Sequence, residues 1–306
     1  MSEAAAPRVV CAGMAVLDQV FFVDRFPAPN TKARADAFFS VVGGCAANAA
    51  IAIARLGGHA ELAAVIGGAS HDDIGDHILS GLTREGVACD AVVRVPEVPS
   101  TISTIMIDAV GDRTIATRCD DRLRAATLGD PRELVAAADA VLVDNWLPDL
   151  VLPVCVAARE RGIPVVLDGD APMPAASRLA ALATHLVFSA DALRATAGRD
   201  DLGEALMAMA RQVTAFVAVT DGANDIAWVE GGALRRRPVF TVAARDTLAA
   251  GDVFHGAFAL ALAEGFADAE ALRFAAAVAA IKCTRRGGGQ GTPWRAEVDA
   301  FLAGRG

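Results

Sequence analysis

The chain has 306 residues, of which 54% are hydrophobic and 21% are charged, and its formal net charge at pH 7 is −9. This composition excludes an intrinsically disordered chain, and the acidic balance without a basic patch argues against nucleic acid as a partner. The length allows one large α/β domain or two small ones.

The start of the chain, MSEAAAPRVV, lacks the basic segment and the apolar core of a signal peptide. No apolar run reaches the roughly 18 residues that are needed to span a bilayer. The six cysteines are scattered and none forms a CxxC pair, which is typical of free thiols in a reducing compartment. We therefore expect a cytoplasmic protein without a membrane partner.

Turn-forming residues and apolar runs divide the first half of the chain into strands and helices. Pro27, Pro29 and Asn30 separate the second and third strands, and Gly57 and Gly86 follow the helices. The predicted elements are strands at 8–15, 18–26 and 35–42, a helix at 45–56, a strand at 60–66, a helix at 74–85, and alternating strands over 90–117.

In the second half, continuous apolar strands alternate with helices, which argues for a parallel sheet covered on both faces. The strands at 18–42 and 90–117 do not fit this rhythm and could form a small separate sheet. We predict one α/β domain over residues 1–306. The remaining predicted elements are strands at 140–143, 164–167, 185–188 and 216–220, a hairpin-like pair at 226–230 and 231–239, a strand-like stretch at 239–244, and helices at 251–264 and 269–284.

The strongest local signal is DTLAAGDVFHGA, at residues 246–257. The small residues Ala249, Ala250 and Gly251 allow backbone N–H groups to face outward at the start of a helix, where they form an anion site together with the helix dipole. Asp252 follows in the first helical turn, where a carboxylate can accept a proton from an attacking hydroxyl. The alternative is that Asp252 merely caps the helix.

A second signal is GGCAAN, in which Gly43 and Gly44 stand at a strand-to-helix turn and Asn48 follows in the helix. A glycine pair lets a ligand approach the backbone closely, and an amide side chain both donates to and accepts from sugar hydroxyls. The alternative is a tight turn followed by an ordinary polar residue.

Together the two stretches resemble the two signature motifs of the PfkB/ribokinase family of carbohydrate kinases, and the resemblance extends from Val9 to Leu302. It implies a ribokinase-like α/β fold, with a central, mostly parallel sheet flanked by helices and with the strands at 18–42 and 90–117 as a small β-sheet lid. Because this lid often builds the dimer interface, a homodimer is expected. The implied activity is transfer of the γ-phosphate of MgATP to a sugar hydroxyl.

The resemblance also assigns roles to particular residues. Asp252 corresponds to the catalytic base, and the anion hole falls on the backbone of residues 249–251. Asp18, in GMAVLD, corresponds to an aspartate that binds substrate hydroxyls. The other positions expected to contact the sugar are Gly43, Gly44 and Asn48.

Further positions correspond to the nucleotide and cation sites of the family. The stretch VTDG at 219–222 resembles a turn against the phosphates, although Asn224 and Asp225 stand where relatives often have another glycine. ATP is expected to contact Thr220, Gly222, Ala276, Ala280 and Gly287. A potassium ion is expected on the side chain of Asp246 and the backbone carbonyls of Leu248, Lys282, Arg285, Gly287 and Gly291.

One departure concerns magnesium. The family usually carries an N-x-x-E motif after a central strand, but the corresponding residues 188–193 are FSADAL. Upstream, Asp168 and Asp170 in LDGD end a strand and could hold hydrated Mg²⁺ directly or through water. The alternative is a polar turn at the strand end.

Several details, among them LDGD, DVFHGA and IKCTRRGG, look most like the sulfofructose kinase branch of the family. Lys32 matches a lysine that this branch uses near the sulfonate, while Trp146 stands about where its arginine partner is expected. Arg118 could supply positive charge from the lid instead. The alternative is that Lys32 and Arg118 are ordinary surface charges and that the sugar is fructose- or ribose-like.

Two rival functions remain open. One is a kinase for a nucleoside or another non-sugar alcohol on the same fold. The other is a ligand-binding regulator without catalysis, which the missing N-x-x-E motif leaves open and the intact DTLAAGD argues against.

Overall fold

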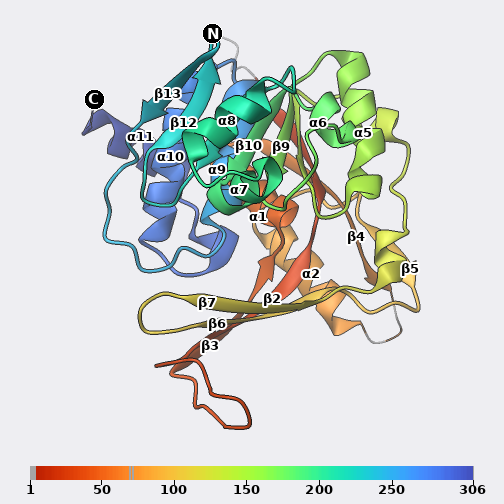
Figure 1. Ribbon diagram of the computed structural model, residues 1–306. Helices are drawn as coiled ribbons and strands as arrows, with labels where there is room; N and C mark the ends of the chain where they lie inside the picture. The colour runs from red at the N-terminus through yellow and green to blue at the C-terminus, as the bar shows by residue number, and fades with distance from the viewer. Residues whose placement is uncertain (1–4, 69, 71, 306) are drawn as a thin grey trace.

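The computed structural model describes residues 5–68, 70 and 72–305, and the strands within them form two sheets (Figure 1). The large sheet consists of β1 (Arg8–Gly13), β4 (His59–Gly68), β5 (Val93–Pro96), β8 (Ala140–Asp144), β9 (Val165–Gly169), β10 (His185–Ser189), β11 (Phe216–Thr220), β12 (Ile226–Glu230) and β13 (Ala233–Arg237). The small sheet consists of β2 (Val16–Phe22), β3 (Ala37–Gly43), β6 (Ile102–Ile107) and β7 (Arg113–Arg118).

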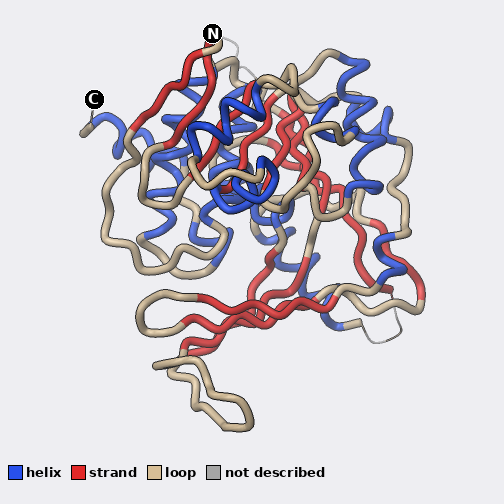
Figure 2. The backbone as a smooth tube through the Cα atoms, in the orientation of Figure 1, coloured by secondary structure: helices blue, strands red, loops and turns tan. Residues whose placement is uncertain are grey.

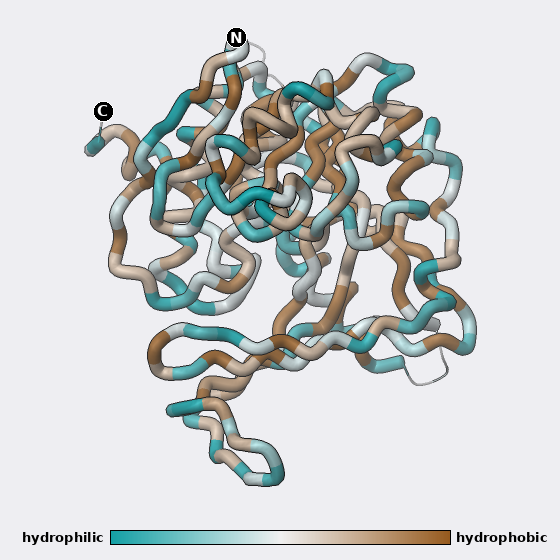
Figure 3. The backbone as a smooth tube through the Cα atoms, viewed as in Figure 1, coloured by the Kyte–Doolittle hydropathy of each residue, from teal (hydrophilic) through white to brown (hydrophobic). Residues whose placement is uncertain are grey.

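The strand order in the large sheet is β13-β12-β11-β10-β9-β8-β1-β4-β5; β12 pairs antiparallel with both β11 and β13, and the other pairs among the described strands of this sheet are parallel. These strands are apolar without alternation because both faces are covered; all five residues of β8 are buried, for example. Figure 3 shows the hydrophobic colour concentrated in the central strands and the hydrophilic colour in peripheral loops. The predicted central parallel sheet is confirmed.

Helices cover both faces of the large sheet (Figure 2). One face packs against α1 (Cys45–Arg55), α2 (Asp73–Arg84), α9 (Ala250–Ala263), α10 (Asp268–Cys283) and α11 (Arg295–Ala303). The other face packs against α3 (Asp121–Arg124), α4 (Pro131–Val135), α5 (Pro148–Arg161), α6 (Arg178–Leu182), α7 (Ala190–Ala197) and α8 (Leu202–Ala210). No helix in the described part of the chain is both long and apolar enough to cross a membrane.

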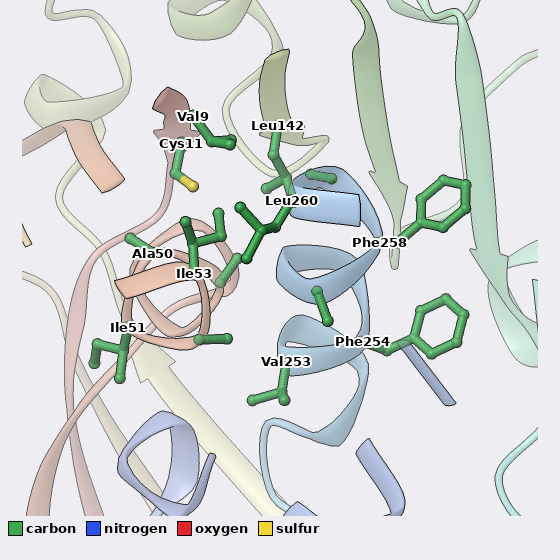
Figure 4. Close-up of a cluster of buried hydrophobic side chains, with 14 of the residues drawn as sticks. Val9, Cys11, Ala50, Ile51, Ile53, Leu142, Val253, Phe254, Phe258 and Leu260 are labelled. Atoms are coloured by element: carbon green, nitrogen blue, oxygen red, sulfur yellow. The ribbon is translucent and has the colours of Figure 1, made fainter. Parts of the chain in front are cut away.

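Helices α1 and α9 pack closely against each other, and they carry the two signature stretches. A Cβ on Gly256 would lie 2.6 Å from the carbonyl oxygen of Ala49, so glycine is needed for this approach. Figure 4 shows Ile53 of α1 and Leu260 of α9 between the two helices, next to Leu142 of β8. This packing fixes the relative positions of the two helix starts, which lie more than 200 residues apart in the chain.

The small sheet has the order β3-β2-β6-β7 and projects below the rest of the molecule in Figures 1 and 2. Its inner face carries Asp18, Val20 and Phe22 of β2, because alternate residues of a strand point to the same side. The buried Val20 packs there with Leu248, which precedes α9. The inner face of this lid therefore covers the start of α9.

Two predicted elements are wrong. Residues 90–117 were expected to belong to the lid, but β5 within this range pairs with β4 and extends the large sheet. The stretch 239–244 was expected to be a strand, but it has no regular structure and passes along the outside of α10 and α11, where Phe240 packs on Phe301. In both cases long-range packing rather than local β-propensity decides the structure.

Candidate active site

The signature residues meet where the strand order reverses. Strand β1 pairs with β4 on one side and with β8 on the other, and all three are parallel. In open α/β sheets, ligands bind beyond the carboxyl ends of the strands at such a switch point. The carboxyl ends of β1, β8 and β9 carry Met14, Asp144 and Asp168, and both signature helices begin at the same edge.

Asp144 is fully buried at the end of β8 and holds this edge together. Its Oδ2 accepts the backbone N–H groups of Met14 (2.7 Å) and Ala46 (3.3 Å), and its Oδ1 accepts that of Trp146 (3.2 Å). Burial raises the pKa of Asp144 to about 6, although these three hydrogen bonds lower it. Sequence reasoning missed this residue, and the available signal was a carboxylate directly after the apolar run AVLV.

Asp252, the predicted base, lies in the first turn of α9 and is connected to α1 by a hydrogen bond. The side-chain amide of Asn48 donates to Asp252 Oδ2 at 2.7 Å, and its Oδ1 accepts the backbone N–H of Gly289 at 3.1 Å. Burial raises the pKa of Asp252, nearby Asp170 raises it further, and the Asn48 hydrogen bond opposes both. Because the hydrogen bond of Asp252 runs to another helix, the simple capping interpretation does not account for it.

The backbone before Asp252 has an uncommon conformation that opens the helix start. Ala249 has φ 61°, in the left-handed region that a non-glycine residue adopts at some cost. Among the described residues, the N–H groups of Ala249 and Gly251 have no hydrogen-bond acceptor, whereas the N–H of Ala250 donates to the carbonyl of Thr247 (3.2 Å). The predicted anion hole thus has two available donors rather than three.

A cluster of acidic groups surrounds Asp252. Ligand atoms of Cys45, Asp168 and Asp252 lie within 4.8 Å of one another. Burial raises the pKa of Asp168 well above its usual value, and the nearby Asp252 and Asp170 add to this effect. Clustered carboxylates of this kind fit a hard divalent cation such as Mg²⁺, which prefers oxygen to the thiol of Cys45.

His255 lies one turn after Asp252 and was not predicted. Its Nδ1 faces the carbonyl of Gly251 (2.7 Å) and lies 3.4 Å from Asp168 Oδ2, while its Nε2 faces the carbonyl of Val187 (3.2 Å). Burial lowers the pKa of His255, while these two carbonyls raise it. His255 therefore links the start of α9 to strands β9 and β10 beneath the carboxylates.

The predicted sugar-contacting residues lie together beneath the lid. Asp18 is buried opposite Ser103 of β6, and its pKa is raised to about 7 by burial and by Asp252, while the Ser103 hydroxyl lowers it. A Cβ on Gly43 would lie 1.9 Å from Asp18 Oδ2, and one on Gly44, at φ 94°, would lie 2.5 Å from the Met14 carbonyl. Glycine at both positions leaves room for the carboxylate and for the turn into α1.

The structure does not bring the two predicted basic residues to this place. Lys32 is exposed in the loop between β2 and β3. Arg118 lies opposite Ile102 and Leu17, on the face of the lid that Asp18 does not share, and its guanidinium reaches Asp120 at 3.4 Å. Arg113 is instead the basic residue on the inner face, where it reaches the hydroxyl of Thr247 (3.5 Å).

Two of the predicted nucleotide residues, Thr220 and Gly222, lie at the same edge of the sheet, at the end of β11 and in the turn after it. Thr220 ends β11 and its hydroxyl donates to the carbonyl of Phe188 (3.4 Å), and Gly222 has φ 57° in the turn that follows. Ala276 and Ala280 are buried on α10. In place of the missing N-x-x-E motif, the hydroxyl of Ser189 accepts the N–H of Ala192 (3.4 Å) and caps α7.

Two of the residues predicted to bind potassium, Asp246 and Leu248, instead contact an ammonium group. Lys282 Nζ donates to the carbonyls of Asp246 (3.0 Å) and Leu248 and lies 3.9 Å from Asp246 Oδ1. The other oxygen of Asp246 accepts the N–H of Gly287 (3.1 Å). The carbonyl of Lys282 accepts the N–H of Arg285 (2.9 Å). Burial lowers the pKa of Lys282, and the carboxylate of Asp246 opposes this.

Comparison with known proteins finds the family that the two signature stretches resemble. Residues 6–295 match the family described as pfkB family carbohydrate kinase. The ribokinase of Bacillus subtilis is 30% identical over 300 residues, which cover 97% of this chain and 100% of that protein. The ribokinase of Arabidopsis thaliana, solved with ribose and ATP, is 27% identical with a TM-score of 0.81, covering 97% of this chain and 99% of that one. A protein of Agrobacterium tumefaciens, provisionally assigned as a ribokinase, reaches 37% identity and a TM-score of 0.92, with 98% and 99% covered.

Proposed function

The chain belongs to the pfkB family and is a carbohydrate kinase, a phosphotransferase with an alcohol group as acceptor; on this premise we propose that it transfers the γ-phosphate of ATP to a hydroxyl of a small, ribose-like sugar, with Asp252 as the base. One observation carries the proposal. A partly buried carboxylate, that of Asp252, is held by Asn48 and stands beside two available N–H groups at the start of α9 and near the sugar-binding candidate Asp18.

The sugar side of the reaction follows from the lid. The ionised carboxylate of Asp18 accepts hydrogen bonds from sugar hydroxyls, and Asn48 and the backbone at Gly43 and Gly44 complete the contact surface. The attacking hydroxyl is then placed against Asp252, which takes its proton. A base whose pKa is raised toward neutrality accepts a proton more readily than an ordinary carboxylate, and burial raises the pKa of Asp252 in this direction.

The phosphate side follows from the start of α9. The N–H groups of Ala249 and Gly251 donate to the oxygens of the phosphoryl group as it is transferred, and the helix dipole adds to this stabilisation. Asp168 and Asp170 would hold hydrated Mg²⁺, which neutralises charge on the phosphates when it is bound. The nucleotide is proposed to contact Thr220, Gly222, Ala276, Ala280 and Gly287.

The choice of sugar is also a proposal. The names of the relatives support ribose, because the Bacillus and Arabidopsis proteins are ribokinases. The sulfofructose hypothesis depends on Lys32 and Arg118, which both lie exposed and away from Asp18. One observation still favours an anionic sugar, namely the position of Arg113 on the inner face of the lid.

Two further expectations remain proposals. A homodimer through the lid is supported by its outer face, where Phe38 is 53% exposed and packs on Phe21 with ring centroids 4.8 Å apart. A cytoplasmic location is supported by the six cysteines, which are all free in the structure.

A substrate panel tests the proposed function. The purified protein is incubated with MgATP and, in separate reactions, ribose, fructose, sulfofructose and a nucleoside. ADP release is measured by a coupled assay, and the product is identified by ³¹P NMR. We expect the highest kcat/KM for ribose and a phosphomonoester as product. Preference for the nucleoside, or ADP release that no sugar stimulates, would refute the proposal.

A further inference from the structure

The last turn of α10 contains a buried lysine that the mechanism above does not use. Lys282 is 0% exposed and is among the largest fully buried side chains. Its neighbours on the helix, such as Ala280 and Ile281, are apolar. Removing an ammonium group from water is costly unless acceptors surround it, so the position of Lys282 requires a specific set of partners.

These partners belong to the loop that leads into the anion hole. Lys282 Nζ donates to the carbonyl of Asp246 at 3.0 Å and to the carbonyl of Leu248, and the carboxylate of Asp246 lies 3.9 Å away. The same carboxylate accepts the N–H groups of Leu248 (2.8 Å) and Gly287 (3.1 Å). The ammonium group thus joins α10, the loop 246–248 and the turn at Gly287.

Because of peptide geometry, the contact between Lys282 and Leu248 also determines the direction of an N–H group in the anion hole. In a trans peptide the C=O of one residue and the N–H of the next point in opposite directions. When the carbonyl of Leu248 points at Lys282, the N–H of Ala249 must point away from Lys282. Ala249 is the residue with φ 61°, and its N–H is one of the two available donors among the predicted anion-hole residues 249–251.

We propose that the ammonium group of Lys282 is a built-in cation that positions this anion hole, so that the enzyme needs no monovalent metal ion. Two carbonyls and a carboxylate around one positive charge are equally the ligands of a potassium ion, and the two cations exclude each other from this space. The inference rests on the proposed phosphoryl transfer, and it replaces the potassium site that the sequence predicted. Lys282 is a positioning residue, because its contacts are with the loop rather than with a substrate.

The wild-type enzyme provides the first test. Its kcat is compared in KCl, NaCl and choline chloride at an equal ionic strength of about 0.1 M, where screening is the same in all three salts. The expected result is no difference beyond assay error. Strong activation by KCl over choline chloride would overturn the proposal, and this measurement does not depend on the folding of any variant.

A matched pair of variants provides the second test. Lys282→Ala empties the space that the ammonium group occupies and leaves the oxygen atoms of Asp246 and Leu248 around it. Lys282→Met fills the same space with a neutral side chain of similar length. In choline chloride both are expected to lose kcat by about 10²–10³-fold, the usual effect of losing an oxyanion-hole donor, with little change in the KM for sugar. KCl and ammonium chloride should restore activity to Lys282→Ala and not to Lys282→Met. Wild-type activity of Lys282→Ala in choline chloride would overturn the proposal.

Thermal melting separates this inference from the proposed function. KCl should raise the melting temperature of Lys282→Ala above its value in choline chloride, because a ligand that binds only the folded state stabilises it. The melting temperature of the wild type and of Lys282→Met should be the same in both salts. This readout applies even if no sugar is phosphorylated, and an equal response of all three proteins would refute the built-in cation.

Discussion

The catalytic edge of the large sheet and the inner face of the lid hold their functional groups in different ways. At the catalytic edge two carboxylates are fixed by groups that cannot move independently: Asp144 accepts three backbone N–H groups, and Asp252 is held by Asn48, which is itself held by the backbone of Gly289. In the lid, Asp18 is positioned by the hydroxyl of Ser103, which contacts the hydroxyl of Thr117 at 2.9 Å. The catalytic groups are thus held by the backbone at the catalytic edge, whereas the groups that select the substrate are held by side chains of the lid, which can adjust.

The largest expected effect tests the catalytic edge. Asp252→Asn keeps the shape of the side chain and removes the proton acceptor, so kcat should fall by about 10²–10⁴-fold, the usual contribution of general-base catalysis. Affinity for a non-hydrolysable ATP analogue, measured by calorimetry, should stay close to that of the wild type. The matched control is Asp299→Asn, which makes the same change of charge on α11 next to Arg295. Turnover within tenfold of the wild type would show that Asp252 is not the base.

The second-largest effect is expected at Gly43, where the lid meets the catalytic edge. In Gly43→Ala the new methyl group would lie 1.9 Å from Asp18 Oδ2 and must displace this flexible carboxylate. Loss of its charge-assisted hydrogen bonds to the sugar should raise the KM for sugar about 10–100-fold, while the melting temperature and kcat change little. Gly129→Ala is the matched control, because a methyl group there meets no atom within 4 Å. An unchanged KM would mean that Asp18 does not bind the sugar.

A smaller effect tests how the lid tunes Asp18. The pKa of Asp18 is raised to about 7, and only its ionised form accepts hydrogen bonds from sugar hydroxyls without donating one. The kcat/KM of the wild type should therefore fall as the pH drops below about 7. The Ser103 hydroxyl lowers this pKa, so Ser103→Ala should move the acid limb to higher pH and lower kcat/KM several-fold at pH 7 but little at pH 9.

The control for this profile is Thr104→Ala, because Thr104 is the next residue on β6 and points to the opposite face of the lid. Its pH profile should match that of the wild type. Two outcomes would show that Asp18 is not the group that titrates. In one, Ser103→Ala leaves the acid limb of the pH profile unchanged; in the other, both variants move it equally.

The sequence predicts the catalytic edge better than the lid, and the reason is physical. Strands that are buried on both faces, such as β8, show as continuous apolar runs, and the residues at the start of α9 carry the anion-site pattern locally. The face on which Arg118 lies depends on the register between strands, and a shift of one residue reverses it. The apolar run AVLV marks Asp144 as a carboxylate at a strand end, but the sequence does not show its role or that of the Lys282 side chain, since these roles come from contacts with residues 130 and 36 positions away in the chain.

The smallest effect on catalysis is expected on the outer face of the lid, where Phe38 is 53% exposed and packs on Phe21 with the two rings tilted. If two copies associate through this face by twofold symmetry, each interface loses two phenylalanine side chains in Phe38→Ser, which should weaken the dimer by about 10²-fold or more. Light scattering after gel filtration measures the assembly, and kcat should stay within about twofold of the wild type, because the face is opposite to Asp18. Val110→Ser, an exposed apolar residue in the turn after β6, is the control and should leave the dimer intact. A monomeric wild type, or a dimer that Phe38→Ser does not weaken, would remove the outer face as an interface and leave the lid with a role in sugar binding alone.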